Sequence, residues 1–579
     1  MNEQQQNFVS HDGAQLFYRY RPPASGRTEK ALILFHRGHE HSARMMHVGE
    51  ELNLEDTAIF AWDARGHGHS PGERGDSPSI DASVADVEAF VRYIERTYDI
   101  DYGQMVVIGQ SVGAVLVAGW LHDYAPKIRA VVLASPAFKV KLYVPFARPG
   151  LRLMQRLRGN FFVNSYVKAH YLTHDQARID SFNNDPLIAR AISVRILLGL
   201  HRLAKRVVAD AQAITVPIQL LISGDDWVVS HQPQHQFFNH LGSADKERHV
   251  LPGFYHDTLG ERDRAQAIDL MRTFIERQFA TPYAPVSVTD ADERSVSRVR
   301  ADKLATPLAK WSPRGMYWRA YRAALRFGAR WSQGLAVGRD AGFDSGATLD
   351  YVYQNQPSGT NAFGRFIDKQ YLSAIGWRGI RGRKRHIQVA INEAFACLEA
   401  AGKEKRVLDI AAGHGRYVLD ALLTSHHPEQ VLLQDFSEAN VAAGGKLIAE
   451  RGLSETVTFV QGDAFDRAAF ADHPIEPTLG IVSGLHELFS DNTLVLQSLY
   501  GFADIISEGG YLIYTAQPWH PQQEMIGRAL SSHRAGQPWV MRCRSQQEMD
   551  QLVEQAGFVK YAQWSGEDGI FTVTLAKRV

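Results

Sequence analysis

The stretch Val106-Val107-Ile108-Gly109-Gln110-Ser111-Val112-Gly113-Ala114-Val115-Leu116 decides the fold of the first half of the chain. Its β-branched, apolar start is typical of a buried strand, and the small and apolar residues after the turn favour a helix. A strand that passes through Gly-x-Ser-x-Gly into a helix has the pattern of a nucleophile elbow. Because that turn is tight, the residues beside the serine must be small, as Gly109 and Gly113 are. We therefore predict that Ser111 is exposed above the end of a strand.

Strands alternate with helices on both sides of this stretch. The predicted strands cover residues 17–21 (an edge strand), 31–35, 57–62, 105–108, 130–134, 217–223 and 249–251, and a helix is predicted over 81–97. Such alternation indicates a parallel sheet with helices on both faces.

Polar residues follow three of these strands at their carboxyl ends, where an α/β sheet places its chemistry. Ser111 comes first along the chain, Asp225 or Asp226 second and His256 third. A serine hydroxyl becomes a good nucleophile when an imidazole takes its proton, and a carboxylate fixes the imidazole tautomer. The order Ser, Asp, His therefore predicts a catalytic triad.

Two histidine-rich turns support this prediction. They are Phe35-His36-x-x-x-Glu40-His41-Ser42-x-Arg44 and Asp63-x-Arg65-Gly66-His67-Gly68-x-Ser70-x-Gly72-Glu73-Arg74. With the elbow, they resemble the monoglyceride lipase and lysophospholipase group of serine aminopeptidase-like α/β-hydrolases, over about residues 10–280. The resemblance implies that Asp226, which precedes x-Val-Val, is the acid. It also implies an oxyanion hole made by the backbone N–H groups of Gly38 and Val112.

One residue departs from that family. Arg37 stands where the family usually has glycine, and arginine lacks the backbone freedom of glycine. Arg37 either fits the loop sterically or adds a cation near an acyl or phosphate group.

Residues 137–205 interrupt the strand pattern with a helical, basic and aromatic insert. It contains Phe138-Lys139, Phe146-Ala147-Arg148 and Leu151-Arg152-Leu153-Met154. In the family, such an insert is a cap that gates acyl chains, and a lining of Leu, Met and Phe suits an acyl chain better than a peptide. The alternative is a surface excursion without a substrate role.

The composition changes after residue 280. Residues 281–310 have little periodicity and are predicted to be a linker, and residues 311–395 a basic, aromatic helical extension. Basic residues and tryptophans gather in 311–331 and again in 377–385. These segments either cap the second domain, with their arginines paired to acids, or contact anionic lipid headgroups at a membrane surface. RNA binding is a third reading.

A second strand–turn–helix lies at residues 406–416, and the next strand, 431–435, ends in Asp435. Glycines let a backbone approach a nucleoside closely, and a carboxylate at the second strand can bind two ribose hydroxyls. A glycine turn alone could equally hold a dinucleotide. Further strands are predicted over 457–460, 479–483 and 510–515, and a terminal antiparallel hairpin over 558–564 and 570–576.

This hairpin, the strand spacing and Gly462-Asp463-Ala464-Phe465 resemble the class I S-adenosylmethionine-dependent methyltransferases, over residues 396–579. The resemblance implies S-adenosyl-L-methionine as cofactor. It places Asp409, Gly413 and Gly415 in the first motif, Asp435 at the ribose, and Asp463 with Ala464 at the adenine. Ala411 replaces the usual first glycine of the motif.

His486 and Glu487 stand where a methyl acceptor would arrive, and residues 340–386 are expected on the acceptor side. A histidine could deprotonate a hydroxyl, and a glutamate could orient an amine. Loop polarity and helix capping explain the two residues equally well. No Asn-Pro-Pro-Tyr or Asp-Pro-Pro-Tyr follows the fourth strand, so N-methylation of the adenine or glutamine type is not expected.

The totals of the chain fit a protein of several domains. A length of 579 residues exceeds what one core covers, and 63 basic residues balance 63 acidic ones, so no overall charge attracts nucleic acid. The two cysteines, Cys397 and Cys543, show no metal-ligand spacing and suit a reducing compartment. A polar N-terminus and the lack of a long apolar run predict a cytoplasmic protein, peripheral at most to a membrane.

The predicted fold class is α/β. Residues 1–280 are expected to form an α/β-hydrolase with a helical cap over 137–205, and residues 396–579 a Rossmann-like methyltransferase preceded by the helical extension. The predicted function is bifunctional: hydrolysis of a lysolipid or monoacylglycerol-type ester, and methyl transfer to a lipid-related or small-molecule acceptor. We expect no metal and no nucleic-acid partner, and the sequence does not define the oligomeric state. The alternatives are an RNA methyltransferase with an accessory esterase, and a regulatory binding protein with one inactive half.

Overall fold

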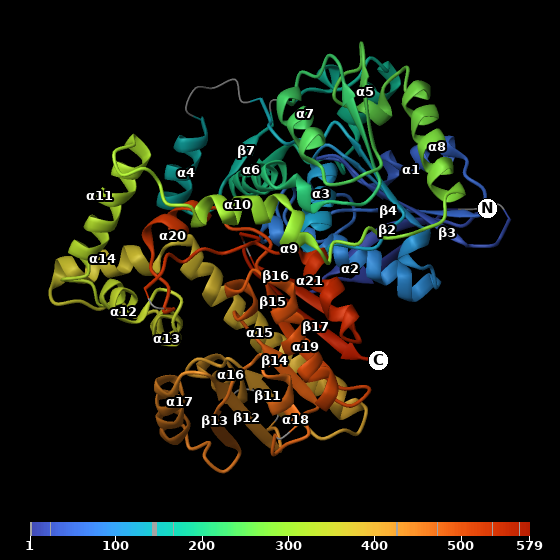
Figure 1. Ribbon diagram of the computed structural model, residues 1–579. Coiled ribbons are helices and arrows are strands. Elements are labelled where there is room, and N and C mark those ends of the chain that lie inside the picture. The colour runs from blue at the N-terminus through green and yellow to red at the C-terminus, as the bar shows by residue number, and fades with distance from the viewer. Residues whose placement is uncertain are drawn as a thin grey trace. The chain divides into compact units, whose positions relative to one another are not determined.

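The computed structural model describes residues 3–23, 25–141, 147–165, 167–423, 427–471, 473–534, 536–566 and 568–579. The chain forms two compact units, residues 1–286 and 287–579 (Figure 1). The predicted hydrolase boundary at residue 280 coincides with the end of helix α8 (Ala265–Ala280). The predicted linker 281–310 is only partly an open connection, because α9 (Ala291–Arg294) and α10 (Val296–Ala305) fold within it. No helix in the described ranges combines the length and the apolar character that a bilayer-spanning helix needs.

The first unit is built on an eight-stranded sheet with the order β1-β2-β4-β3-β5-β6-β9-β10. Its strands are β1 (Gln4–Val9), β2 (Gln15–Arg21), β3 (Lys30–Phe35), β4 (Thr57–Trp62), β5 (Met105–Gln110), β6 (Ala130–Ala134), β9 (Ile218–Ser223) and β10 (Lys246–Leu251). The β1–β2 and β2–β4 pairs are antiparallel, and every later pair is parallel. The edge strand expected at 17–21 is instead the second strand, because β1 pairs along its outer side.

Helices cover both faces of this sheet, as the apolar strands predict (Figure 1). Along β3, Ile33 and Phe35 pack against α2 (Ile80–Tyr98), α3 (Val112–Tyr124) and α6 (Val194–Ala209). Leu32 and Leu34 point the other way and pack against α1 (Met46–Leu52) and α8. The two-residue period of the strand therefore divides the core into two layers.

The cap lies within residues 137–205, of which 142–146 and 166 are outside the described residues, so Phe146 is not described. Its elements are α4 (Ala147–Arg158), β7 (Phe162–Asn164), α5 (Gln176–Asn184), β8 (Ala191–Ser193) and the start of α6. Phe138 is buried, whereas Leu153 and Met154 on α4 are exposed. Of the apolar residues expected to line the cap, Phe138 is therefore inside the protein, whereas Leu153 and Met154 face solvent.

The second unit contains a seven-stranded sheet with the order β13-β12-β11-β14-β15-β17-β16. Its strands are β11 (Arg406–Ile410), β12 (Gln430–Asp435), β13 (Val457–Gln461), β14 (Leu479–Val482), β15 (Tyr511–Ala516), β16 (Phe558–Ser565) and β17 (Thr572–Arg578). Strand β17 is antiparallel to both of its neighbours, which confirms the predicted terminal hairpin. This arrangement is a Rossmann-like sheet with an added antiparallel edge.

Two groups of helices surround this sheet. The extension consists of α11 (Pro313–Gly328), α12 (Gln333–Ala341), α13 (Gly346–Gln354), α14 (Ala362–Leu372) and α15 (Ile375–Ala400). The core helices are α16 (Arg416–Leu422), α17 (Glu438–Glu450), α18 (Arg467–Ala471), α19 (Asn492–Ile505), α20 (Gln523–Ala529) and α21 (Gln546–Gln555). Helix α15 crosses the predicted boundary at residue 395, because its apolar stripe from Ile387 to Leu398 packs on the sheet. The extension and the core therefore share one continuous helix.

Candidate functional sites

Ser111 lies in a strained turn between β5 and α3. Its backbone has φ 55° and ψ −110°, in the region that L residues rarely adopt. A Cβ atom at Gly113 would lie 2.5 Å from the carbonyl oxygens of Phe35 and His36, and one at Gly109 would lie 2.8 Å from the Cα of Ala114. Both glycines are thus required by close packing, as the sequence predicted.

Three side chains form one hydrogen-bonded chain at this turn. The Ser111 Oγ lies 2.7 Å from His256 Nε2, and His256 Nδ1 lies 2.7 Å from Asp226 Oδ2. The other oxygen of Asp226 accepts hydrogen bonds from the N–H groups of Val228 and Val229. All three side chains are buried, so the prediction that Ser111 is exposed is wrong: it is only 3% exposed, because His256 lies against its hydroxyl. The structure therefore brings together the serine, imidazole and carboxylate that the sequence placed at three strand ends.

Of the two candidate acids, the structure brings Asp226 and not Asp225 to His256. Asp225 is exposed, and its carboxylate accepts a hydrogen bond from the N–H of Gly253. Burial would raise the pKa of Asp226, but the charge and the hydrogen bond of His256 outweigh it, so the pKa lies below its ordinary value. Asp226 is therefore ionised at neutral pH and can stabilise a charged imidazole.

The expected oxyanion donors lie next to each other. A Cβ atom at Gly38 would lie 2.9 Å from Cγ2 of Val112, so the two backbones approach closely. Val112 begins α3, where the first N–H groups of a helix have no partner within it. Among the described residues, neither the Gly38 nor the Val112 N–H donates a hydrogen bond to the protein. Both remain available to a ligand oxygen.

Arg37 fits into the loop without a left-handed backbone, which His39 adopts instead at φ 72°. Its guanidinium donates to Glu40 at 2.8 Å, lies 3.8 Å from Asp257, and stacks over the ring of Phe182. Arg37 is thus part of a buried ion cluster beside the triad. It faces carboxylates of the protein, which supports the steric reading over a phosphate-binding one.

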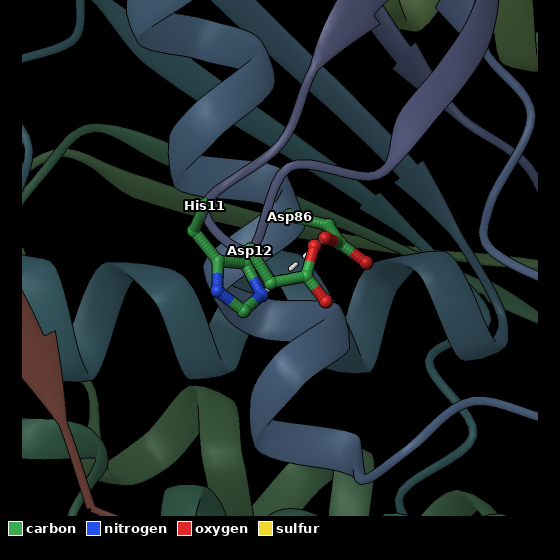
Figure 2. Close-up of side chains that lie close together, drawn as sticks. All are labelled: His11, Asp12 and Asp86. Atoms are coloured by element: carbon green, nitrogen blue, oxygen red, sulfur yellow. Dashed lines mark ion pairs between the residues drawn. The ribbon is translucent and has the colours of Figure 1, made fainter.

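One group of side chains in the described part of the chain could hold a metal ion: His11, Asp12 and Asp86 (Figure 2). Arg65 already donates to both carboxylates, at 2.9 Å to Asp12 and 2.6 Å to Asp86. The guanidinium neutralises the charge that would attract a cation. This cluster is explained as an ion pair that ties the β1–β2 turn to α2.

A cavity of about 750 Å³ lies at the carboxyl ends of β11, β12 and β13 in the second unit, and we call it the glycine-turn cavity. Five of the six predicted cofactor residues line it: Gly413, Gly415, Asp435, Asp463 and Ala464. Gly413 and Gly415 have φ values of 60° and 71°, in the region that favours glycine. Ala411 also has a positive φ, 53°, although it is not glycine.

Asp435 is held firmly at the end of β12. One carboxylate oxygen accepts the Gly413 N–H at 2.8 Å, and the other accepts the Ser437 N–H and the Asn440 side-chain amide at 2.9 Å each. The carboxylate is therefore fixed beside the glycine turn, at the place expected of a ribose ligand.

Asp409, the sixth residue, lies in a different environment. It is fully buried, both of its oxygens lie 2.7 Å from the Tyr417 hydroxyl, and it is not among the residues that line the glycine-turn cavity. Burial raises the pKa of Asp409 well above its ordinary value, although the Tyr417 hydrogen bond opposes this. The structure therefore supports a structural role for Asp409, which supports the glycine turn through its contact with Tyr417.

A second cavity, of about 340 Å³, lies between the extension and the core of the same unit, and we call it the extension cavity. Its lining residues on the extension include Tyr321, Leu325, Leu335, Leu349, Ile367, Tyr371, Ala374, Trp377, Ile380 and Arg383, and those on the core include Glu487, Gln517, His520, Met525, Leu530, Trp539, Met541 and Phe571. It shares Asp344, Leu349, Gly484 and Leu488 with the glycine-turn cavity. The two cavities thus meet along a common wall.

His486 and Glu487 are adjacent in sequence but have different surroundings. Glu487 lines the extension cavity, whereas His486 lines neither cavity and lies 2.7 Å from the Ser498 hydroxyl. Burial, aided by the nearby Arg544 charge, lowers the pKa of His486 to about 3, so its imidazole is neutral. Of the two residues, the structure places only Glu487 beside a space that a ligand could fill.

For the basic segment 377–385, the structure agrees with the reading of a cap whose basic residues pair with acids. Trp377 and Arg383 are buried and line the extension cavity, Lys384 pairs with Asp420, and Arg378 pairs with Asp568. Arg378 and Arg385 are nevertheless exposed. In the segment 311–331, several aromatic residues are exposed, with Trp311 at 82%.

The sequence did not identify the core side of the extension cavity. Gln517 directly follows β15, and His520 lies three residues later. The carboxyl end of a parallel strand is the signal that could have found them. Trp539 and Phe571 have no such signal, because their position follows from the tertiary fold.

Comparisons with known proteins agree with this division. A family model described as "Putative methyltransferase" matches residues 271–578, and one described as "Serine aminopeptidase, S33" matches residues 26–263. The chain is 55% identical over 571 residues to the uncharacterized protein YnbC of Escherichia coli, covering 99% of this chain and 98% of that one. It is 28% identical over 262 residues to rat monoglyceride lipase, covering 43% and 82%. It is 23% identical over 257 residues to phospholipase YtpA of Bacillus subtilis, covering 43% and 96%.

The methyltransferase model spans more than half of the chain, and the Escherichia coli relative matches it almost from end to end. The chain therefore belongs to that methyltransferase family, and its N-terminal half is a hydrolase domain of the S33 serine aminopeptidase family.

Proposed function

We propose that the chain is a bifunctional enzyme, a serine ester hydrolase joined to an S-adenosylmethionine-dependent methyltransferase. The observation that carries the first activity is the hydrogen-bonded chain from Ser111 through His256 to Asp226. The names of the relatives, a monoglyceride lipase and a phospholipase, favour a lysolipid or monoacylglycerol-type ester as substrate.

The geometry supports a mechanism through an acyl-serine. Ser111 Oγ attacks the ester carbonyl while its proton passes to His256 Nε2, and Asp226 stabilises the imidazolium. The N–H groups of Gly38 and Val112 stabilise the oxyanion. His256 then protonates the leaving alcohol, and the same imidazole activates the water that releases the fatty acid.

The test of this half is covalent labelling. A fluorophosphonate is expected to modify the folded chain once, and peptide mass spectrometry is expected to locate the adduct on Ser111. Release of fatty acid from a monoacylglycerol and from a lysophospholipid, measured in parallel, then distinguishes the two ester classes. A chain that hydrolyses neither ester and whose Ser111 is not labelled would support a binding protein with an inactive hydrolase half.

The second activity rests on the glycine-turn cavity. The cavity fits S-adenosylmethionine because it combines a glycine turn, the fixed Asp435 carboxylate, and a buried Ser483 hydroxyl without a partner among the described residues. Asp435 would bind the ribose, and Asp463 with Ala464 would hold the adenine. Gly413 and Gly415, which have no side chain, would let the ligand approach the backbone of the turn closely. The cofactor supplies a methyl group on a sulfonium, which is already a strong electrophile, so positioning by the protein does most of the work.

Asp435→Ala tests this assignment. Loss of charge-assisted hydrogen bonds to the ribose is expected to weaken S-adenosylmethionine binding about 10- to 100-fold in titration calorimetry. The matched control is Glu476→Ala, which removes a carboxylate that is 90% exposed. Equal affinity in Asp435→Ala and the control would contradict the cofactor assignment.

We further propose that the segment 311–331 contacts a membrane surface. Its exposed side chains include Trp311, Tyr317 and Phe327, and Arg319 stacks on Trp311. Such pairing of aromatic and cationic groups suits the headgroup region of anionic lipid. Co-flotation with phosphatidylglycerol vesicles is expected, and loss of flotation in Trp311→Ala would support the assignment. Salt-sensitive RNA binding without flotation would favour the RNA methyltransferase alternative.

A further inference from the structure

The extension cavity has mainly apolar walls that include several aromatic rings. Trp377 and Trp539 are stacked with ring centroids 6.4 Å apart, and the ring of Phe571 lies 4.9 Å from the Arg383 guanidinium. Leucine and isoleucine side chains of five extension helices complete the wall. A concave space of about 340 Å³ with this lining has the size and character of a site for a small apolar molecule.

Four polar atoms on this wall have no partner in the described protein. They are Glu487 Oε2, the Trp539 indole N–H, the Tyr371 hydroxyl and Arg383 Nε. Glu487 is only 7% exposed and Arg383 only 3%. Because a buried polar group without a hydrogen bond costs about 1–3 kcal/mol, unpaired atoms around one cavity indicate a ligand that completes them.

The orientation of Glu487 defines what the ligand must offer. Its Oε1 accepts the Thr515 hydroxyl at 2.8 Å and lies 3.8 Å from Arg383 Nη1, so this oxygen is occupied. The free oxygen, Oε2, can only accept a hydrogen bond when the carboxylate is ionised. The ligand therefore presents an O–H or N–H donor to it.

The charged side chains on the wall already have partners within the protein. Arg383 and Glu487 form one buried pair, and Asp344 accepts hydrogen bonds from the Ser532 hydroxyl and the His533 N–H and lies 3.0 Å from the His533 imidazole. Burial lowers the pKa of His520 to about 4, so its imidazole is neutral at pH 7. An added charge would be buried without a counter-charge, which is costly. A neutral ligand is the one that fits.

We propose that the extension cavity binds the methyl acceptor, and that this acceptor is a neutral, mainly apolar hydroxyl or arylamine compound. Its donor group binds Glu487 Oε2, and its apolar body lies between Trp377, Trp539 and Phe571. The proposal rests on the proposed methyltransferase function and adds the chemical class of its substrate. Methylation of the acceptor forms one bond to carbon and breaks the methyl–sulfur bond of the cofactor, whose electron pair stays on sulfur. The proton that the acceptor loses passes to the Glu487 carboxylate.

Binding is tested on the full chain with N-phenyl-1-naphthylamine, a neutral arylamine that fluoresces in apolar surroundings. We expect saturable binding with one site per chain. Ala374→Phe places a ring inside the cavity and is expected to weaken binding at least tenfold. The matched control, Ala396→Phe, adds the same ring on the exposed side of α15 and is expected to leave binding unchanged.

A second blocking variant guards against misfolding. Leu530→Trp fills the cavity from the core side, and each variant is accepted only if its melting temperature lies near that of the wild type. Probe binding that persists unchanged in both folded blocking variants would overturn the proposal. Binding lost in both, and kept in Ala396→Phe, would support it.

Transfer of labelled methyl from S-adenosylmethionine tests the acceptor class. The acceptors are 2-naphthol and 1-dodecanol, which separate an aromatic from an aliphatic substrate, with a short RNA and choline as charged alternatives. Glu487→Gln is expected to keep probe binding within about threefold and to lower transfer at least 100-fold, because the amide cannot take the proton. Transfer only to the charged acceptors would overturn the inference.

Failure of the proposed methyltransferase function and failure of the proposed acceptor cavity give different results. A wild-type chain that does not bind S-adenosylmethionine in calorimetry would contradict the proposed function alone, since probe binding is measured without cofactor. A chain that binds the cofactor but not the probe would contradict the acceptor cavity alone.

Discussion

The Ser111 site and the extension cavity satisfy their polar groups in opposite ways. At Ser111, the hydroxyl, both ring nitrogens of His256 and both oxygens of Asp226 have partners within the protein. Around the extension cavity, Glu487, Trp539 and Arg383 each have a buried atom that no described residue pairs with. The catalytic side chains at Ser111 are therefore paired before any substrate binds, and the backbone N–H groups of Gly38 and Val112 are left for it. In the proposed account, the extension cavity instead leaves side-chain atoms for the methyl acceptor.

The largest expected effect separates the two halves. Ser111→Ala removes the nucleophile and is expected to lower kcat for a p-nitrophenyl ester by about 10⁴-fold or more. Binding of S-adenosylmethionine is expected to stay unchanged, because the two sites lie in different units. An ester hydrolysis assay measures the loss of kcat, and calorimetry on the same preparation measures the binding of S-adenosylmethionine. Residual hydrolysis near the wild-type rate would remove Ser111 from the mechanism.

The next effect concerns the buried ions beside the triad. Arg37→Ala leaves Glu40 and Asp257 with one cation fewer in a fully buried cluster, and is expected to lower the unfolding free energy by about 3 kcal/mol. The control Arg262→Ala breaks an exposed pair with Asp263 and is expected to change it by less than about 0.5 kcal/mol. Urea unfolding of both variants checks this. Equal stability of the two would show that Arg37 has no structural role.

The third effect is a pH dependence in the second unit. Burial lowers the pKa of His486 to about 3, so the folded chain keeps it neutral while the unfolded chain, with a pKa of about 6.5, binds a proton. Its stability contribution is complete above pH 6.5 and is lost as the pH falls toward 3. At pH 5 the loss is about 2 kcal/mol relative to pH 7.

His486→Gln removes this titration and can keep the hydrogen bond to Ser498. The melting temperature of the variant is therefore expected to fall less between pH 7 and pH 5 than that of the wild type. An identical fall in both proteins would exclude His486 as a source of acid sensitivity.

The smallest effect lies in the glycine turn. Ala411 has a φ of 53°, which costs about 1–2 kcal/mol for a residue with a Cβ. Ala411→Gly relieves this cost but adds freedom to the unfolded chain, so a net gain of at most about 1 kcal/mol is expected. Gly413→Ala, at φ 60°, is the mirror experiment and is expected to destabilise by a similar amount. Calorimetric melting that moves in the same direction for both variants would contradict the strain argument.

The parts of the molecule that could be predicted from the sequence are those that local patterns of residues determine. The elbow, the strand ends and the glycine turn follow from short patterns of residue type and spacing, and the sheets, the Ser111–His256–Asp226 geometry and the lining of the glycine-turn cavity agree with them. Strand β1 was missed because Gln4, Gln5 and Gln6 have little preference for strands, and only its pairing with β2 forms it.

The acceptor side depended on tertiary packing. The cluster around Trp377 and Arg383 resembles a solvated surface in sequence, and only the fold shows that Glu487 and Phe571 enclose it. Likewise, the sequence could not distinguish His486 from Glu487, because neighbouring residues in a short 3-10 turn point in different directions. Patterns locate elements, but the burial of a charge depends on residues far away in the chain.

Native mass spectrometry of the full chain, incubated with both a fluorophosphonate and S-adenosylmethionine, tests the central claim most directly. We expect one species with one covalent phosphonate and one bound cofactor. Ser111→Ala should keep only the cofactor, and Asp435→Ala only the phosphonate. A wild-type chain without bound cofactor, or a phosphonate that remains on Ser111→Ala, would contradict the account of two complete and separate active sites.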